Sequence, residues 1–377
     1  MLQKLLYLFI VITLFVACKN DQSQSIDVAP LNTSVDYAKG FTINHISNYT
    51  VIKVTNPWPG ADKAYTYAFA KNLDLIEDAT MYDAVVEVPV KNMVVTSTTH
   101  IPSLEMLNEI ETLVGFPNLD YISSEAARLK ISEGTIKELG KNEALNTETL
   151  IDLSPDAVVS FAVEGEGQSL KVIKNAGIPV FINADWTETH PLGKAEWIKF
   201  FGVLYDKEKE ADSIFNAISK DYSDAKKLAK GAAKSPTVLS GAMYKDVWYM
   251  PQGDSWAAQF ITDANGTYLW NDHKGTGSIA LNIESVLDKG QFAEVWIGPG
   301  QFNSKTQLLE SNPVYGQFDA FKNNALYTFT SKVGATGGVL YYELAPNRPD
   351  IVLKDIIKIL HPELELEHEP FFFTAIK

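Results

Sequence analysis

The chain has a single cysteine, Cys18, in 377 residues, and only two arginines, Arg128 and Arg348. One cysteine cannot form an internal disulfide or build a cysteine-ligated zinc or iron–sulfur site. Histidine is also scarce, with six scattered residues and no His-Glu-x-x-His motif. The sequence has neither a phosphate-binding loop nor a Gly-x-Ser-x-Gly nucleophile elbow. It therefore favours no catalytic class, and we expect no enzymatic activity and no resident cofactor.

Basic patches and a second long apolar run are missing as well. The formal net charge is −15 at pH 7, and no cluster of Lys and Arg alternates with aromatic residues. This pattern argues against nucleic acid as a partner. Beyond residue 17 no apolar segment is long enough to cross a bilayer, so we expect a soluble body rather than an integral membrane protein.

The amino terminus, "MLQKLLYLFIVITLFVAC", carries one lysine and then an apolar run that is typical of a secretory signal. Its end, "FVAC", resembles the lipobox of bacterial lipoproteins, in which the cysteine becomes the lipid-bearing first residue. The resemblance implies cleavage after residue 17, lipid attachment at Cys18, and a location in the periplasm or on an extracytoplasmic membrane face. An ordinary signal peptide with an unmodified cysteine is the alternative. Residues 18–40 are polar and predict a flexible tether.

Hydrophobic patterning divides the remainder into two α/β lobes. Residues 41–190 predict the N-terminal lobe, and alternating segments within residues 41–90 predict an extra antiparallel β ribbon at its edge. Residues 233–377 predict the C-terminal lobe. The linker region, residues 191–232, contains apolar residues three or four apart over residues 207–230, which predict one long helix joining the lobes. A long surface helix inside a single domain is the alternative.

Two segments of the chain nearly repeat each other: "LNTETLIDL" at 145–153 and "LNIESVLDK" at 281–289. Asn146 and Asn282 are predicted to cap the first turns of two helices, with Glu148 and Glu284 exposed just inside them. A carboxylate there stabilises a helix by roughly 0.3 to 1 kcal/mol through the helix dipole. That local effect does not explain why the phrase recurs once in each predicted lobe.

The order of lipobox, α/β lobe, long helix and α/β lobe resembles the class III periplasmic binding proteins that serve ABC importers of ferric siderophores, haem and cobalamin. The resemblance covers residues 91–377 and is strongest at "LNTETLIDLSPDAVVSF". It implies a ligand cleft between two Rossmann-like lobes, a monomer, and cargo that itself carries iron or cobalt. It also implies that Glu148 and Glu284 dock against arginines of a permease dimer that works with an ATPase. A related protein that binds bare zinc or manganese, and a permease-independent surface lipoprotein, are the alternatives.

Ligand contacts are expected from loops at the carboxyl ends of the predicted strands, where clefts between α/β lobes are lined. Large aromatic side chains in those loops suit a large, partly planar ligand. Each aromatic could instead belong to the core, His100 could serve its own turn, and Arg348 could pair with Asp350. The candidate contacts are Thr99, His100 and Trp186 in the first lobe, and Tyr244, Trp248, Trp256, Tyr341 and Arg348 in the second.

Overall fold

The structure is a computed structural model that describes residues 35–46 and 48–377. The described residues belong to one compact unit, Thr33–Lys377. The predicted signal peptide, the lipid attachment at Cys18 and most of the tether lie outside the described residues. Within the described ranges, no helix combines the length and the apolar character needed to span a membrane.

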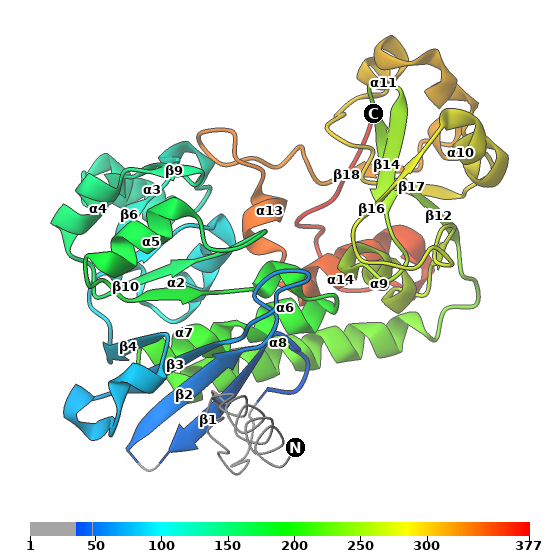
Figure 1. The fold of residues 1–377 in the computed structure, drawn as a ribbon. Helices are drawn as coiled ribbons and strands as arrows, with labels where there is room; N and C mark the ends of the chain where they lie inside the picture. The colour runs from blue at the N-terminus through cyan, green and yellow to red at the C-terminus, as the bar shows by residue number, and fades with distance from the viewer. Residues whose placement is uncertain (1–34, 47) are drawn as a thin grey trace, which may run out of the picture. The chain divides into compact units, whose positions relative to one another are not determined.

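The N-terminal lobe is built on a parallel five-stranded sheet with the order β11-β10-β5-β6-β7 (Figure 1). Its central strands are wholly buried, as expected for a parallel sheet with helices on both faces. The strands are β5 (Met93–Val95), β6 (Leu113–Phe116), β7 (Lys137–Glu138), β10 (Ala157–Ser160) and β11 (Val180–Ile182), and the helices around them are α2 (Ile101–Met106), α3 (Glu125–Ser132), α4 (Thr147–Leu153), α5 (Gln168–Asn175), α6 (Pro191–Glu196) and α7 (Ile198–Leu204).

The C-terminal lobe repeats this plan with a sheet of order β15-β12-β17-β18-β19, parallel except for the last strand. A small antiparallel sheet, β13-β14-β16, is added to it. The strands are β12 (Thr237–Ser240), β13 (Ala242–Tyr244), β14 (Val247–Pro251), β15 (Thr267–Tyr268), β16 (Ser278–Leu281), β17 (Val295–Ile297), β18 (Leu326–Thr328) and β19 (Thr374–Ala375), and the helices are α9 (Trp256–Asp263), α10 (Ile283–Gly290), α11 (Lys305–Ser311), α12 (Asp319–Lys322), α13 (Leu340–Leu344) and α14 (Pro349–Leu360).

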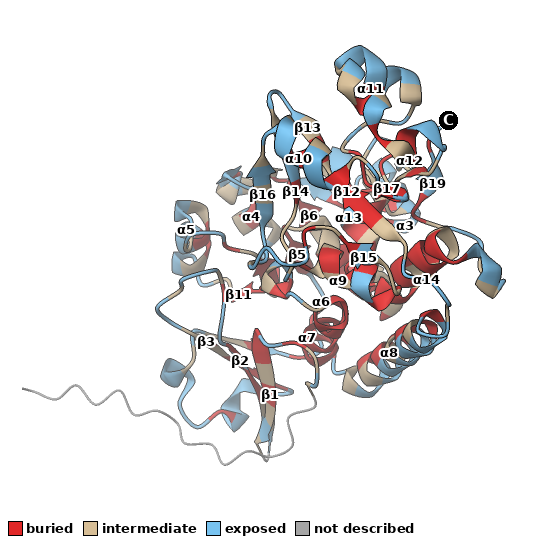
Figure 2. Ribbon diagram, turned by 90° about the vertical axis from the view of Figure 1, so that its right-hand side faces the viewer, coloured by how far each residue is buried: buried red, intermediate tan, exposed pale blue. Residues whose placement is uncertain are grey.

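One long helix, α8 (Glu208–Ala229), connects the two lobes, as the sequence predicted (Figure 1). It packs against α7 of the first lobe and α14 of the second. Its buried residues recur at helical spacing and form one stripe that faces the protein (Figure 2). A single helix that packs on both lobes keeps their separation nearly constant, because a hydrogen-bonded rod does not bend as freely as a loop. The fold is therefore the predicted one: two Rossmann-like lobes and an interdomain helix.

A further four-stranded sheet, β1-β2-β3-β4, precedes the N-terminal lobe. The sequence predicted an antiparallel ribbon, but only β1, β2 and β3 are antiparallel, whereas β4 runs parallel to β3. The prediction failed because the chain between β3 and β4 is no tight hairpin: it passes through two short 3-10 helices and returns in the same direction. The strands are β1 (Phe41–Ile46), β2 (Tyr49–Val54), β3 (Tyr65–Ala70) and β4 (Ala84–Glu87), with 3-10 helices at Leu73–Leu75 and Ala79–Met81.

The extra sheet covers the exposed edge of the lobe's own sheet. The backbone N–H of Ile182, in edge strand β11, donates to the hydroxyl of Tyr67 at 2.8 Å. The rings of Phe69 and Phe181 stack with their centroids 5.4 Å apart. An uncovered strand edge would otherwise expose unpaired backbone groups. The sheet therefore acts as a cap on the N-terminal lobe.

Residues 36–40, which the sequence assigned to the tether, are held on the surface of the N-terminal lobe. The backbone amides of residues 36–38 donate to the buried carboxylate of Glu196 at 2.7–2.8 Å. Those of residues 39 and 40 donate to Glu188 at 2.8–3.0 Å. Charge-assisted bonds of this kind are the stronger class of hydrogen bond. The folded body thus begins several residues before β1.

Candidate ligand-binding site

A large pocket of about 610 Å³ lies in the C-terminal lobe. It is lined where strands β12 and β17 end, by β13 and β14, and by helices α9 and α13. Its lining, taken from the described part of the chain, contains no Asp, Glu, Lys, Arg or His. Nine of the lining side chains are aromatic: Tyr244, Tyr249, Trp256, Phe260, Phe302, Phe329, Tyr341, Tyr342 and Phe373.

Four of these rings form a continuous wall. Trp256 lies 5.9 Å from Tyr341, Tyr341 stacks on Phe329 at 4.3 Å, and Phe329 meets Phe373 edge-on at 5.8 Å, all measured between ring centroids. Offset-stacked and edge-to-face pairs at such distances stabilise one another beyond their buried area. The wall is consequently rigid, apolar and suited to a flat ligand.

A smaller pocket of about 260 Å³ lies in the cleft between the lobes. The N-terminal lobe contributes Thr96, Ser97 and Thr98, which follow strand β5, together with Asn142 and other residues. The C-terminal lobe contributes residues 338, 339, 342 and 343. Tyr342 lines both pockets, so the two spaces adjoin. The smaller pocket therefore combines hydroxyl and amide groups with the rings of Phe116, Tyr121 and Phe161 and the carboxyl group of Glu343.

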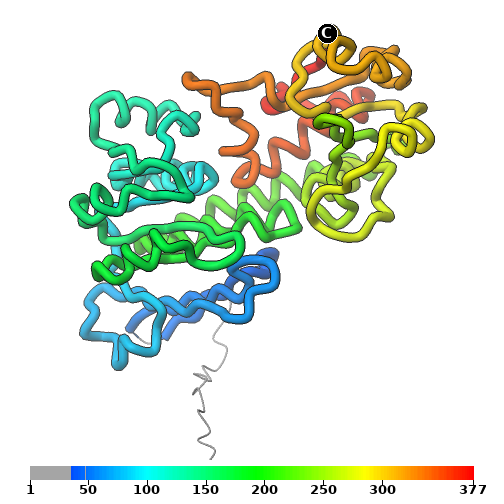
Figure 3. The backbone as a smooth tube through the Cα atoms, turned by 45° about the horizontal axis from the view of Figure 1, so that its top comes forward, coloured from blue at the N-terminus to red at the C-terminus, as the bar shows by residue number. Residues whose placement is uncertain are grey.

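The segment after β18 runs between the two lobes (Figure 3), and its hydrogen bonds to the N-terminal lobe hold them together. The hydroxyl of Thr336 donates to the carbonyl oxygen of Asp120 at 2.7 Å. The hydroxyl of Ser123 donates to the carbonyl oxygen of Gly338 at 3.0 Å, and its backbone N–H donates to Glu343 Oε2 at 2.7 Å. We call these three contacts the interlobe bridge.

Glu343 is the ionisable residue of the interlobe bridge, and it is buried, with only 5% of its surface exposed. Burial raises the pKa of Glu343 to about 7, against the lowering effect of the bond from Ser123, and the charge of nearby Glu105 adds to the rise. Near neutral pH the carboxyl group is therefore partly protonated.

Three of the five sequence-predicted contacts of the C-terminal lobe line the large pocket, namely Tyr244, Trp256 and Tyr341. Trp248 does not, because it is 0% exposed: its ring stacks on Trp296 at 5.3 Å, and its indole N–H donates to the carbonyl oxygen of Ser240 at 3.0 Å. It has no surface to offer a ligand and belongs to the core.

Arg348 lines neither pocket. Its Nε and Nη2 donate to the two oxygens of Asp350 at 3.0 and 2.8 Å. Its guanidinium group thus pins its own loop at the start of α14, which is the alternative that the sequence left open.

The predicted contacts of the N-terminal lobe line neither pocket. Thr99 donates its hydroxyl to Asp185 at 2.8 Å, and Trp186 is 38% exposed. His100 is completely buried, and neither ring nitrogen has a hydrogen-bond partner among the described residues. Burial lowers the pKa of His100 to about 4, a fall that the charge of Asp185 partly offsets. His100 is therefore a neutral core residue in this arrangement.

Two residues that complete the aromatic wall, Phe329 and Phe373, were not predicted from the sequence. Phe329 directly follows strand β18, and Phe373 lies in the C-terminal run "FFFTAI". Three consecutive phenylalanines near a chain end were the available signal, since such a run needs a packing surface. What the run packs against could not be inferred locally, because its partners lie elsewhere in the chain.

The two repeated phrases form the predicted helix starts. Asn146 accepts the N–H of Thr149 at 3.1 Å, and Asn282 accepts that of Ser285 at 2.8 Å, so both N-caps are confirmed. Glu148 is the second residue of α4 and Glu284 the second of α10, and both are exposed. Helices α4 and α10 belong to different lobes (Figure 1). Whether these carboxylates dock a permease stays a prediction.

Across residues 35–46 and 48–377, no three His, Cys, Asp or Glu side chains gather closely enough to hold a metal ion.

Comparison with known proteins assigns the chain to one protein family. A family model described as periplasmic binding protein matches residues 93–333. An uncharacterized lipoprotein of Methanocaldococcus jannaschii is 27% identical over 298 residues, which cover 77% of this chain and 69% of that protein.

Solved structures agree with this fold. A possible iron-binding (periplasmic solute-binding) protein from Staphylococcus epidermidis has a TM-score of 0.56 at 18% identity, covering 72% of this chain and 99% of that one. The periplasmic heme-binding protein of Vibrio cholerae has a TM-score of 0.54 at 14% identity, covering 70% and 99%. The family model spans most of both lobes, and the chain therefore belongs to the periplasmic binding protein family, in its class III form with a long interdomain helix.

Proposed function

We propose that this protein is the substrate-binding component of an ABC importer, exported and anchored through a lipid at Cys18. It captures a metal chelate in the cleft and delivers it to a permease dimer and its ATPase. Membership of the family supports the carrier role. The lipobox, together with the lipoprotein description of the Methanocaldococcus jannaschii relative, supports the anchor.

We infer the class of ligand from the lining of the large pocket. This lining has nine aromatic side chains and no formally charged one. An ionised ligand group placed there would lose its hydration without gaining a partner, which is strongly unfavourable. Aromatic faces favour a flat or ring-rich ligand. The pocket therefore suits a chelate of low net charge, and cobalamin is the best match among the cargoes considered.

The smaller pocket supports the same assignment. Ser97, Thr98 and Asn142 line it with hydroxyl and amide groups, beside the rings of Phe116 and Phe161. Neutral polar groups of this kind pair well with amide substituents at the edge of a ring system. A ligand with an apolar face and a rim of amides would use both pockets.

Haem is the second candidate. Tyr244 and Tyr342 line the large pocket and are more than half exposed, so a phenol oxygen of either could approach an iron centre. The Vibrio cholerae neighbour is described as a heme-binding protein. Against haem stand its two carboxylates, for which this pocket offers no cationic partner.

Delivery would use one carboxylate on each lobe. Glu148 and Glu284 are exposed at the first turns of α4 and α10, where no ion pair in the described part of the chain engages them. Exposed ion pairs contribute little affinity each and are screened by salt. Docking would accordingly depend on the spacing of the two lobes, which α8 maintains.

The test is a tryptophan-fluorescence titration of the chain from Lys19 onward. Residues 33–377 form one compact unit, so this chain keeps the whole described body. Cyanocobalamin, haem, several ferric siderophores, Zn²⁺ and Mn²⁺ are titrated separately, with absorbance and dilution controls. We expect saturable quenching by cobalamin with an affinity of about micromolar or tighter.

Matched variants locate the signal. Trp256→Phe should remove most of the quenching, because Trp256 lines the pocket, whereas Trp186→Phe should retain it, because Trp186 lines neither pocket. Saturable binding of Zn²⁺ or Mn²⁺ alone would instead favour the bare-metal class. Flat titrations with every chelate, on demonstrably folded protein, would refute the proposed cargo.

A further inference from the structure

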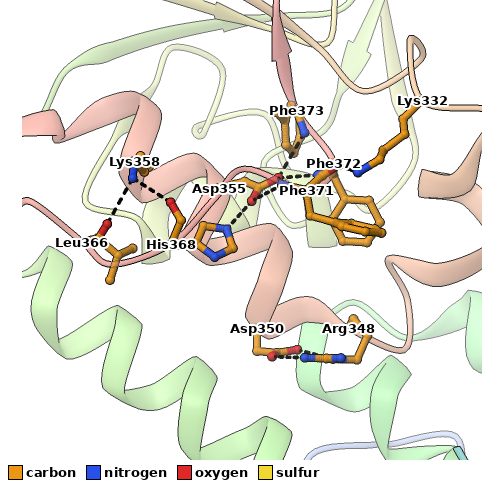
Figure 4. Close-up of polar contacts among 10 residues, drawn as sticks. All are labelled: Lys332, Arg348, Asp350, Asp355, Lys358, Leu366, His368, Phe371, Phe372 and Phe373. Atoms are coloured by element: carbon orange, nitrogen blue, oxygen red, sulfur yellow. Dashed lines mark hydrogen bonds and ion pairs between the residues drawn. The ribbon is translucent and has the colours of Figure 1, made fainter.

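The last residues of the chain are fastened to helix α14 by one buried carboxylate (Figure 4). Asp355 is 0% exposed. It accepts the backbone N–H groups of Phe371, Phe372 and Phe373 at 2.5–3.0 Å, and it also contacts Nε2 of His368. A buried carboxylate is costly unless its lone pairs are satisfied, and three consecutive amides satisfy it. The bond set therefore dictates the path of the C-terminal tail, residues 365–377.

Two lysines and a strand add to this attachment. Nζ of Lys358 donates to the carbonyl oxygens of Leu366 and His368 at 3.2 and 2.6 Å. Lys332 lies in the segment after β18. Its Nζ donates to the carbonyl oxygen of Phe371 at 2.9 Å and lies 3.7 Å from the centroid of the Phe371 ring. Strand β19 then pairs with β18. The tail is thus an integral part of the C-terminal lobe.

The tail delivers a side chain to the large pocket. Phe373 is 4% exposed and lines it, with its ring 5.8 Å from both Phe329 and Tyr341. The neighbouring Phe372 packs edge-on against Tyr341 at 5.6 Å. Because Asp355 holds the backbone amides of these same phenylalanines, its position determines where the end of the aromatic wall stands.

We infer that Asp355 is a positioning residue of the ligand site, and that the tail it holds supplies Phe373 as a contact for the ring face of the ligand. This inference rests on the proposed function, since it takes the aromatic pocket as the binding site. The tail lies outside the segment that the family model matches, residues 93–333. The assignment therefore comes from this chain's own contacts.

An asparagine weakens the attachment. Oδ2 of Asp355 accepts from all three amides, so Asp355→Asn can keep one oxygen there. It removes the negative charge that strengthens these bonds, however, and places an NH₂ group beside the N–H of Phe371, where Oδ1 now accepts. The tail should then detach locally while the core of the lobe stays packed. Phe373→Ala removes the contact and keeps the attachment.

Asp350→Asn is the matched control. Asp350 is on the same helix, is 1% exposed and accepts two hydrogen bonds from Arg348, but it does not hold the tail (Figure 4). It lines neither pocket. A loss of global stability alone should affect Asp350→Asn and Asp355→Asn alike.

The experiment measures binding of Nile red, a neutral planar dye, to the chain from Lys19 onward, together with hydrogen exchange of residues 371–377. We expect Asp355→Asn to raise the dye's Kd about tenfold and to speed exchange in the tail. Phe373→Ala should raise the Kd similarly with little change in exchange. Asp350→Asn should leave both within about twofold, even where its melting temperature falls.

Several outcomes would overturn the inference. Faster exchange in Asp355→Asn with an unchanged Kd would show that the tail is attached but is not part of the site. Equal loss of affinity in Asp355→Asn and Asp350→Asn would reduce the effect to stability. If Asp355→Asn does not fold, an unchanged Kd in Phe373→Ala decides against the contact. Absence of saturable dye binding to the unsubstituted chain would refute the aromatic pocket itself, and with it the proposed function.

Discussion

Glu343 should make the stability of the protein depend on pH in a direction opposite to that of most carboxylates. Its carboxyl group is buried in the interlobe bridge, and that burial raises its pKa to about 7. The folded protein therefore holds a proton that the unfolded chain releases near the ordinary value of 4.5. Stability contributed by this group is present at low pH and is lost as the pH rises through the interval between those two values.

The size of the effect follows from the shift. Each unit of pKa corresponds to about 1.4 kcal/mol, so Glu343 should cost the folded state roughly 3 kcal/mol above neutral pH compared with acid pH. Glu343→Gln removes the titration and keeps one acceptor for the N–H of Ser123. Its NH₂ group is a donor and cannot accept from the second amide, that of Ser124, and the loss of that hydrogen bond costs about 1 kcal/mol.

Glu343→Gln should therefore be less stable than the unsubstituted chain by about 1 kcal/mol near pH 4.5 and more stable by about 2 kcal/mol near pH 8. Urea unfolding at a series of pH values measures both free energies of unfolding, and their difference cancels the other titrating groups. Glu105→Gln is the informative control: without the Glu105 charge, the pKa of Glu343 should fall and the pH dependence should shrink. A difference that stays flat between about pH 4.5 and about pH 8 would refute the reasoning.

Two further predictions test the docking carboxylates and the buried histidine. Charge reversal at both Glu148 and Glu284 to Lys should abolish uptake of the cargo in cells and leave its affinity for the isolated protein unchanged; normal uptake by the double variant would contradict the docking role. His100, whose pKa burial lowers to about 4, contributes stability that is present above its ordinary pKa and lost as the pH falls. The unsubstituted chain should consequently lose roughly 2 kcal/mol relative to His100→Leu between about pH 7 and about pH 5, and a pH-independent difference in urea unfolding would contradict this.

Local rules predicted much of the architecture. The helix expected over residues 207–230 runs from Glu208 to Ala229, because apolar residues three or four apart leave one face to bury. The N-caps at Asn146 and Asn282 could be predicted, because a short polar side chain just before a helix accepts hydrogen bonds from the backbone amides of that helix's first turn. The direction of β4 could not be predicted, since it depends on the path of the chain through the two 3-10 helices between β3 and β4.

The residues that line the large pocket were predicted in part, and strand β14 shows why. Trp248 and Tyr249 are adjacent in the sequence, but side chains alternate along a strand, so Trp248 enters the core and Tyr249 lines the pocket. Choosing between them requires the register of β14 against β13 and β16. A shift of that register by one residue would have exchanged their roles.

By itself the sequence determined the two α/β lobes, the helix between them, and the capped helix starts that carry Glu148 and Glu284. These features depend on spacing and on neighbours a few residues away. Only the tertiary structure decided which aromatic rings form the wall of the pocket, that Asp355 brings Phe373 to it, and that Arg348 serves its own loop instead. The physical reason is that convergence of side chains depends on strand register and on contacts between residues far apart in the chain, which no local pattern encodes.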